Sequence, residues 1–235
     1  MKRFHHKYTL PAILTLLVVA LGLLWHGISN LRSQTTLPSD ANSSVIGLEL
    51  DQTFGYIDLH EVQDHGVSFV YLKSTQGRTY FDDDYLSYRD QILGTKLAFG
   101  TIIAYSNEST PMQHLRYFNK KVGSNTGTLP ILIVPAVKAR NSHYLIQMAQ
   151  FTQLLKQSGK KVMVKLSVRY HKYFASDVLF MADAPNEPSK LQYAFWCYNH
   201  DGHVQSVSGL EDGVTMFAYN GTVAQYKQKY GQLIQ

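Results

Sequence analysis

Residues 45–77, VIGLELDQTFGYIDLHEVQDHGVSFVYLKSTQG, contain two apolar runs separated by a polar segment. The runs Val45–Leu50 and Val67–Lys73 are predicted to be buried strands, with a short helix between them. A strand, a helix and a second strand form a βα unit, in which the loops after the strands carry the chemistry. Glu49 lies near the end of the first strand and Gln76 just after the second. We therefore expect both side chains to face one cleft.

The order and spacing of residues in this stretch resemble the opening of glycoside hydrolase family 25, the muramidases that cut bacterial peptidoglycan. The family pattern is G-x-[DE]-x, a gap of five or six residues, G-x-I-D, and then G-V-x-F-V-x-x-K-[AS]-T-[EQ]-G. The matching residues are Gly47, Glu49, Gly55, Ile57, Asp58, Gly66, Val67, Phe69, Val70, Lys73, Thr75 and Gly77. Two polar positions differ, since Glu49 replaces the family's Asp and Gln76 replaces the Glu of its A-T-E-G.

The resemblance covers about Val45–Leu233 and implies an α/β fold, an irregular (β/α) barrel of the TIM-like type. Further strands are predicted at Leu97–Tyr105 and Leu191–Asn199, and helices at Pro111–Val122 and Ser142–Ser158. The resemblance also implies hydrolysis of the MurNAc–GlcNAc β-1,4 bond of peptidoglycan. A fold does not establish an activity, so the polar positions of the cleft decide whether this chemistry is retained.

A strand predicted at Thr128–Val137, TLPILIVPAV, resembles the family's L-P-x-(L/V)-D-x-E strand, whose two carboxylates complete the acid machinery. On that pattern Ile133 stands at the Asp position and Pro135 at the Glu position. No shift of the alignment restores an acid, because the 68 residues from Ser109 to Ser176 contain no Asp or Glu. Glycosidases need two facing carboxyl groups. Glu49 is the remaining catalytic candidate, and the domain is expected to be catalytically impaired or inactive.

The resemblance implies sugar contacts for a further set of residues at the cleft. These residues are Asp51, Gln76, Tyr105, Ser167, Tyr170, Trp196, Tyr198 and Tyr219. For Tyr170 and its basic and aromatic neighbours, ordinary packing of a helix face is an open alternative to stacking on sugars.

Three functions remain open at this stage. The first is a non-catalytic relative that binds glycan strands of the cell wall or another envelope protein. The second is an active muramidase that combines Glu49 with an acid from elsewhere, such as Asp51, Asp177 or Asp212. The third is a non-enzymatic scaffold that docks anionic wall polymer or an envelope protein.

The charge distribution is consistent with the third function and equally with an ordinary solvated surface. Residues 109–176 hold eleven Lys or Arg and no acid, whereas the other residues beyond position 28 carry 8 basic and 17 acidic side chains. The net charge of the whole chain is +5, which falls to +2 beyond position 28. Such a small excess does not indicate a nucleic-acid partner, and the predicted partner is peptidoglycan or another cell-wall glycan.

No cofactor and no metal site are predicted. His200, Asp201 and His203 lie close together in a Gly-containing turn between two predicted strands, but a zinc site also needs ligands from a second element. Cys197 is the single cysteine, which excludes an intramolecular disulfide. It is expected to be a buried strand residue rather than a catalytic thiol.

The N-terminal residues predict a membrane anchor. Residues 10–28, LPAILTLLVVALGLLWHGI, contain no charged side chain and follow a basic start. As a helix they would extend about 28 Å, close to the hydrocarbon thickness of a bilayer. Residues 10–28 are thus predicted to be a transmembrane signal-anchor, with 1–9 a cytoplasmic basic tail, 29–44 a flexible stalk and 45–235 the barrel domain.

This arrangement implies localisation in the cell membrane, with a single pass and an extracellular C-terminal domain. A cleaved signal peptide is the alternative, because a basic start and an apolar run describe both. The length of the run and the lack of a small-x-small cleavage pattern after it favour the anchor.

Overall fold

The structure, a computed structural model, describes residues 9–32, 34–39, 45–137 and 141–231. The chain divides into two compact units, Met1–Thr35 and Thr36–Gln235. Residues 1–8 of the predicted tail (1–9) and residues 33 and 40–44 of the predicted stalk (29–44) lie outside the described residues.

The first unit contains helix α1 (Thr9–Arg32), which extends beyond the predicted anchor into the residues predicted to be a stalk. Its large apolar side chains between Ile13 and Trp25 are all more than half exposed. Among the residues that the structure describes, no helix is both long enough and apolar enough to cross a membrane. The predicted transmembrane segment at 10–28 is therefore not supported by the structure.

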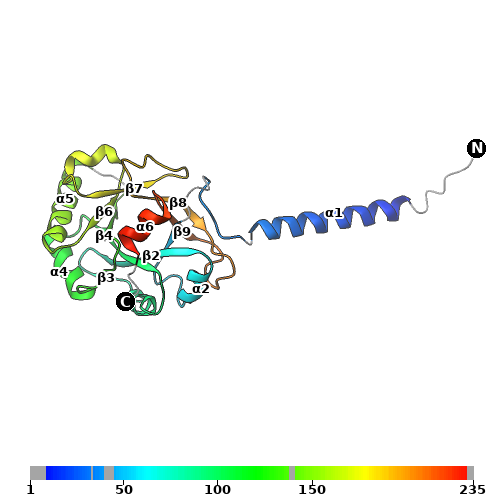
Figure 1. Cartoon of the computed structure of the whole chain (residues 1–235), viewed down its shortest axis with the longest axis horizontal. Helices are drawn as coiled ribbons and strands as arrows, with labels where there is room; N and C mark the ends of the chain where they lie inside the picture. The colour runs from blue at the N-terminus through cyan, green and yellow to red at the C-terminus, as the bar shows by residue number, and fades with distance from the viewer. Residues whose placement is uncertain (1–8, 33, 40–44, 138–140, 232–235) are drawn as a thin grey trace, which may run out of the picture. The chain divides into compact units, whose positions relative to one another are not determined.

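The second unit alternates strands with helices (Figure 1). Its strands and helices in chain order are β1 (Ile46–Leu50), α2 (Leu59–Asp64), β2 (Val67–Gln76), β3 (Tyr80–Phe81), α3 (Tyr85–Ile92), β4 (Ala98–Tyr105), α4 (Pro111–Lys121), β5 (Ile131–Pro135), α5 (Ser142–Gln157), β6 (Val162–Lys165), the 3-10 helix η1 (Val168–Tyr173), β7 (Leu179–Asp183), β8 (Phe195–Gly202), β9 (Val214–Tyr219) and α6 (Val223–Tyr230).

Eight strands close into a barrel in the order β1, β2, β4, β5, β6, β7, β8 and β9, with β9 pairing back to β1. Neighbouring strands from β1 to β8 are parallel. Strand β9 is antiparallel to both of its neighbours, which makes the barrel irregular. This topology confirms the predicted TIM-like α/β barrel.

Alternate residues of each strand face the barrel interior and the surrounding helices, because side chains alternate along a strand. The interior is lined by buried residues that include Phe69, Tyr71, Leu132, Met163, Met181, Phe195 and Phe217. Tyr226 and Tyr230 of α6 pack on the same cluster, against the rings of Phe69 and Phe195. Helix α6 thus closes the end of the barrel at which the parallel strands begin.

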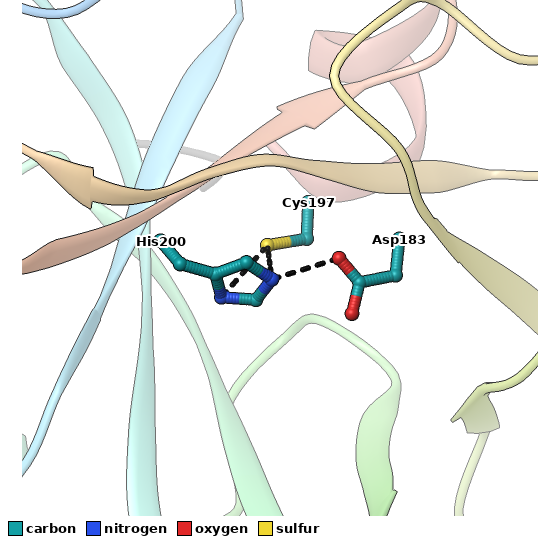
Figure 2. A group of neighbouring side chains, drawn as sticks. All are labelled: Asp183, Cys197 and His200. Atoms are coloured by element: carbon teal, nitrogen blue, oxygen red, sulfur yellow. Dashed lines mark hydrogen bonds and ion pairs between the residues drawn. The ribbon is translucent and has the colours of Figure 1, made fainter.

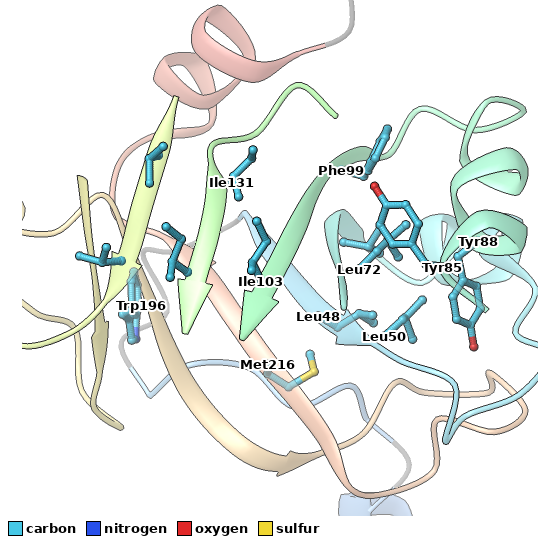
Figure 3. Close-up of a cluster of buried hydrophobic side chains, with 14 of the residues drawn as sticks. Leu48, Leu50, Leu72, Tyr85, Tyr88, Phe99, Ile103, Ile131, Trp196 and Met216 are labelled. Atoms are coloured by element: carbon cyan, nitrogen blue, oxygen red, sulfur yellow. The ribbon is translucent and has the colours of Figure 1, made fainter. Parts of the chain in front are cut away.

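The opposite faces of the strands form an outer core beneath the helices (Figure 3). This outer core contains Leu48 and Leu50 of β1, Leu72 of β2 and Ile103 of β4, together with the rings of Tyr85 and Tyr88 from α3. The two apolar faces explain why the strands of this sequence are nearly continuous apolar runs.

Large rings inside the barrel require small residues opposite them. A Cβ atom on Gly47 would lie 2.3 Å from two ring atoms of Phe69, and one on Gly100 would lie 2.4 Å from the ring of Tyr71. These two glycines leave room for the rings inside the barrel. Gly47 is also one of the residues that match the family pattern, and its closeness to Phe69 is the physical reason for a glycine there.

Gly47→Ala is expected to destabilise the barrel by about 1–3 kcal/mol, because the added methyl group displaces the ring of Phe69 in a close-packed interior. The measurement is the free energy of unfolding from urea denaturation. Gly94→Ala is the control, since the nearest atom to a Cβ there lies at 3.4 Å, an ordinary contact. Equal losses in the two variants would contradict the prediction.

Candidate functional site

The apolar interior of the barrel ends in a layer of polar side chains where the parallel strands end. Each member follows an interior position by two residues, so strand alternation turns it toward the barrel axis. The members are Glu49 on β1, Lys73 on β2, Lys165 on β6, Asp183 on β7 and Cys197 on β8. This end of a TIM-like barrel is where active sites of the fold are found.

Glu49 is the carboxyl group of this layer whose pKa is raised. Burial raises the pKa of Glu49, and the positive charges of Lys165 and Lys73 only partly oppose the shift. The nearby charge of Asp51 raises it further. Glu49 therefore keeps its proton to a higher pH than an ordinary glutamic acid, a property that suits a general acid.

Asp51, which directly follows β1, is held by donors. Its carboxylate lies 3.0 Å from Nζ of Lys73 and accepts a hydrogen bond from the backbone N–H of Thr53 at 2.9 Å. Burial acts to raise the pKa of Asp51, but the bonds from Thr53 and Lys73 outweigh it, and the pKa lies below its ordinary value. Asp51 is ionised at neutral pH.

Asp183 and Cys197 pair side by side across β7 and β8, and His200 lies beside them (Figure 2). One carboxylate oxygen of Asp183 lies 2.8 Å from Nε2 of His200, and the other lies 3.3 Å from Nζ of Lys165. The thiol of Cys197 lies 3.5 Å from the same Nε2 atom. The sequence prediction of a buried strand position for Cys197 is confirmed, with 1% of the residue exposed.

The charges of this group set its protonation states. Burial acts to raise the pKa of Asp183, but Lys165 and His200 outweigh it, so the pKa is lowered. Burial raises the pKa of the Cys197 thiol to about 11, although Lys165 opposes the shift. Cys197 is thus a thiol rather than a thiolate at neutral pH, and it lacks the activation that a catalytic cysteine needs.

Strand β5 corrects the choice of which of its residues face the barrel interior. Leu132 belongs to the interior cluster, and Val134 packs against it, whereas Ile133 belongs to the outer core beneath the helices. The positions that face the barrel interior are therefore Leu132 and Val134, not Ile133 and Pro135. The correction leaves β5 without an acid, because the alternating positions on both of its faces are apolar.

The other predicted cleft residues divide between exposed and buried positions. Gln76 is exposed as the last residue of β2, and Ser167 is exposed after the end of β6. Tyr105, Trp196 and Tyr198 belong to the outer core and are 1%, 0% and 8% exposed. These three aromatic side chains therefore lie on the outer side of the strands rather than facing the barrel axis.

The structure explains the burial of two of these rings by their contacts. Tyr105 stacks on the imidazole of His114 at 4.5 Å, and the hydroxyl of Tyr198 donates to the backbone oxygen of Thr36 at 2.8 Å. Thr36, in the predicted stalk, is thereby fastened to the barrel unit, and its backbone N–H also donates to the oxygen of His203 at 3.0 Å.

Tyr219 and Tyr170 lie apart from Glu49. The backbone N–H of Tyr219 donates to the oxygen of Val45, because β9 is antiparallel and ends where β1 begins. Its ring borders a cavity of ≈ 990 Å³ among η1, the start of β7 and α6. Tyr170 is partly buried in η1, with the guanidinium of Arg169 4.8 Å from its ring centre.

Two of the alternative acids, Asp177 and Asp212, lie outside the strands. Asp177 is exposed before the start of β7 and pairs with Lys156. Asp212 is exposed before β9.

Sequence reasoning did not single out Lys165 and Asp183. Each of them ends an apolar strand two residues after a methionine, and this period of two is the signal that marks them.

Comparison with known proteins shows the family. A family model described as "Glycosyl hydrolases family 25" matches residues 51–223. The chain belongs to glycosyl hydrolase family 25. The sequence prediction of this family is confirmed, whereas no curated protein matches the chain.

Solved structures of family 25 members share the fold. A family 25 glycosyl hydrolase from Bacillus anthracis has a TM-score of 0.69 at 16% identity, over 85% of this chain and 98% of that one. A bacterial lysozyme from Streptomyces coelicolor has a TM-score of 0.61 at 21% identity, over 78% and 95%. A family GH25 lysozyme from Aspergillus fumigatus has a TM-score of 0.61 at 15% identity, over 80% and 99%.

Glu49→Gln is expected to have a higher free energy of unfolding than the wild-type barrel. This difference should grow as the pH rises above 4.5, the ordinary pKa of a glutamic acid side chain. The folded-state pKa is raised, so the stability that the protonated carboxyl contributes is present below the unfolded pKa and is lost as the pH rises through the folded pKa. A glutamine does not titrate. The measurement is the free energy of unfolding of both proteins between pH 4 and pH 8, about the range in which a raised carboxyl titrates.

Glu211→Gln, at an exposed position, is the control for a change of net charge. A difference between wild type and Glu49→Gln that stays constant with pH, or shrinks as the pH rises, would show that Glu49 is not desolvated in the folded protein.

Proposed function

We propose that the barrel is a lysozyme-like domain that binds bacterial cell-wall peptidoglycan and has little or no hydrolytic activity. The single observation that carries this proposal is strand β5, which directs Leu132 and Val134 toward the interior. Hydrolysis in this family, as the resemblance implies it, relies on two carboxylates from that strand. Family membership supports the glycan ligand, and the muramidases and lysozymes of similar fold support peptidoglycan as its source.

The remaining carboxyl groups form a poor catalytic pair. A glycosidase needs one carboxyl group to protonate the leaving oxygen and a second to act as nucleophile or base, about 5–9.5 Å apart. Glu49 suits the first role, but Asp51 is paired with Lys73, and Asp183 is held between Lys165 and His200. A base or nucleophile from this set would first have to leave its ion pair.

The test measures binding and turnover of the same preparation. The full chain is expected to sediment with insoluble peptidoglycan and to be released by soluble glycan fragments. Release of reducing sugar should be at least ~100-fold slower than for an active family member, because general acid–base catalysis contributes about that much or more. Turnover close to that of the active enzyme would overturn the proposal.

An active muramidase that uses Glu49 is the second candidate. The raised pKa of Glu49 beside the ionised Asp51 favours it, because two carboxyl groups whose pKa values are pushed apart are the usual acid and base of a glycosidase. This candidate predicts clearing zones on cell-wall gels that disappear in Glu49→Gln and persist in Glu211→Gln, a change at an exposed position. Binding that is lost in salt and is not competed by glycan fragments would instead favour a scaffold for anionic wall polymer.

We also propose that the chain is held at the cell membrane by a single pass, with the barrel outside the cell. The support is the uncharged run at residues 10–28 after a basic start. In a bacterial host, the full chain should stay in the membrane fraction after alkaline extraction, and protease added to intact protoplasts should remove the barrel. A variant without residues 10–28 is the control. Recovery of the intact full chain in the soluble fraction would contradict this localisation.

A further inference from the structure

Asp183, Cys197 and His200 bring three different ligand types together at the end of β7 and β8. One ligand atom from each residue lies within 4.8 Å of the others. Nε2 of His200 lies 2.8 Å from an oxygen of Asp183 and 3.5 Å from the sulfur of Cys197. In Figure 2, dashed lines join the imidazole of His200 to the sulfur of Cys197 and to one carboxylate oxygen of Asp183.

A regular strand would not place Cys197 and His200 on one face. Side chains of a strand alternate, so residues three positions apart point to opposite sides. The pairing of β8 with β9 shifts between Cys197 and Asn199 and again between Asn199 and Gly202. An extra residue on one strand re-aims the side chains that follow it, and such irregularities occur often beside functional sites. The shifts return His200 to the side of Cys197.

We propose that Asp183, Cys197 and His200 bind a divalent transition-metal ion of the zinc class at the mouth of the barrel, the end at which its parallel strands finish. Thiolate, imidazole and carboxylate are the ligands that zinc uses in proteins. In a tetrahedral site their atoms are separated by about 3.5 Å for sulfur and nitrogen and about 3.3 Å for nitrogen and oxygen. The observed 3.5 Å between sulfur and Nε2 matches this spacing, whereas the 2.8 Å between Nε2 and the carboxylate oxygen is shorter. Because the sulfur also lies 3.7 Å from Nδ1, the imidazole has to turn so that Nε2 points at the ion.

The surroundings are compatible with an ion at this point. Asp183 directs one oxygen to His200 and the other to Lys165, so it can coordinate through the first while Lys165 continues to orient the carboxylate. An outer partner of this kind is usual for a carboxylate ligand. The positive charge of Lys165 opposes the ion, whereas the carboxylate of Asp183, which pairs with Lys165, attracts it.

The ion would have a path to the site. The side chains of His200 and Asp183 are 57% and 52% exposed, and Cys197 is buried beneath them. Three protein ligands would leave one coordination position for water or substrate, as in catalytic rather than structural zinc sites. The proposal is independent of peptidoglycan binding, because none of these three residues was assigned to the glycan.

The trio formed by His200, Asp201 and His203 does not compete for this role. Asp201 accepts a hydrogen bond from the backbone N–H of Gly213 at 3.1 Å, and Nδ1 of His203 lies 3.0 Å from the hydroxyl of Thr36. Only His200 of that trio turns toward Cys197. Within the described part of the chain, Asp183, Cys197 and His200 are the one group with suitable ligand spacing.

The test is titration of the metal-free full chain with Co²⁺, followed by competition with Zn²⁺. The expected result is one equivalent of cobalt with a thiolate-to-cobalt charge-transfer band in the near ultraviolet, which Zn²⁺ abolishes. Cys197→Ser should lose the band. Asp183→Asn and His200→Asn should weaken cobalt binding at least ~10-fold, since loss of even an outer partner has that effect.

His171→Asn is the matched control, because His171 is an exposed histidine whose ring bonds the backbone of its own 3-10 helix. It should leave the band and the affinity unchanged. Should Cys197→Ser fail to fold, the two variants at the exposed positions decide, with far-ultraviolet circular dichroism as the check on folding. No charge-transfer band in the wild type, or an unchanged band and affinity in both Asp183→Asn and His200→Asn, would overturn the proposal.

Discussion

The structure depends on filling a closed barrel with side chains from one face of each strand. Rings of Phe69, Tyr71, Phe195 and Phe217 occupy the interior, and Gly47 and Gly100 leave room for them. Since a barrel has no free edge and its interior is close-packed, each interior row has to run in register with its neighbours. The register then determines which side chain ends each row at the mouth.

The mouth is polar because the inward-facing positions at the ends of the strands lie beyond the close-packed apolar interior. Lysines alternate with carboxyl groups there, so Asp51 and Asp183 each have a cationic partner. Glu49 lies deeper, and its desolvation outweighs the two lysines near it. The polar layer at this end of the barrel therefore consists largely of ion pairs, and beside them lie Glu49 and the thiol of Cys197, whose pKa values are raised by burial.

Strand prediction succeeded where the apolar runs were long, and the helices predicted at Pro111–Val122 and Ser142–Ser158 appear as α4 and α5 within one residue of their predicted ends. The site was less accessible to sequence reasoning. An alignment cannot distinguish the two faces of an apolar strand such as β5, because both faces are buried and both are hydrophobic. The interior positions Leu132 and Val134 became clear only from the contacts of the closed barrel.

The sequence by itself determined the family 25 barrel, the position of Glu49 at the end of the first strand, and the absence of acids from residues 109–176. These features follow from local patterns of apolar residues, glycines and charge. Only the tertiary structure decided that Tyr105, Trp196 and Tyr198 lie on the outer side of the strands, and that Asp183 meets Cys197 and His200. The reason is that both outcomes depend on pairing between strands and on the irregular pairing of β8, and neither has a signature in the sequence of one strand.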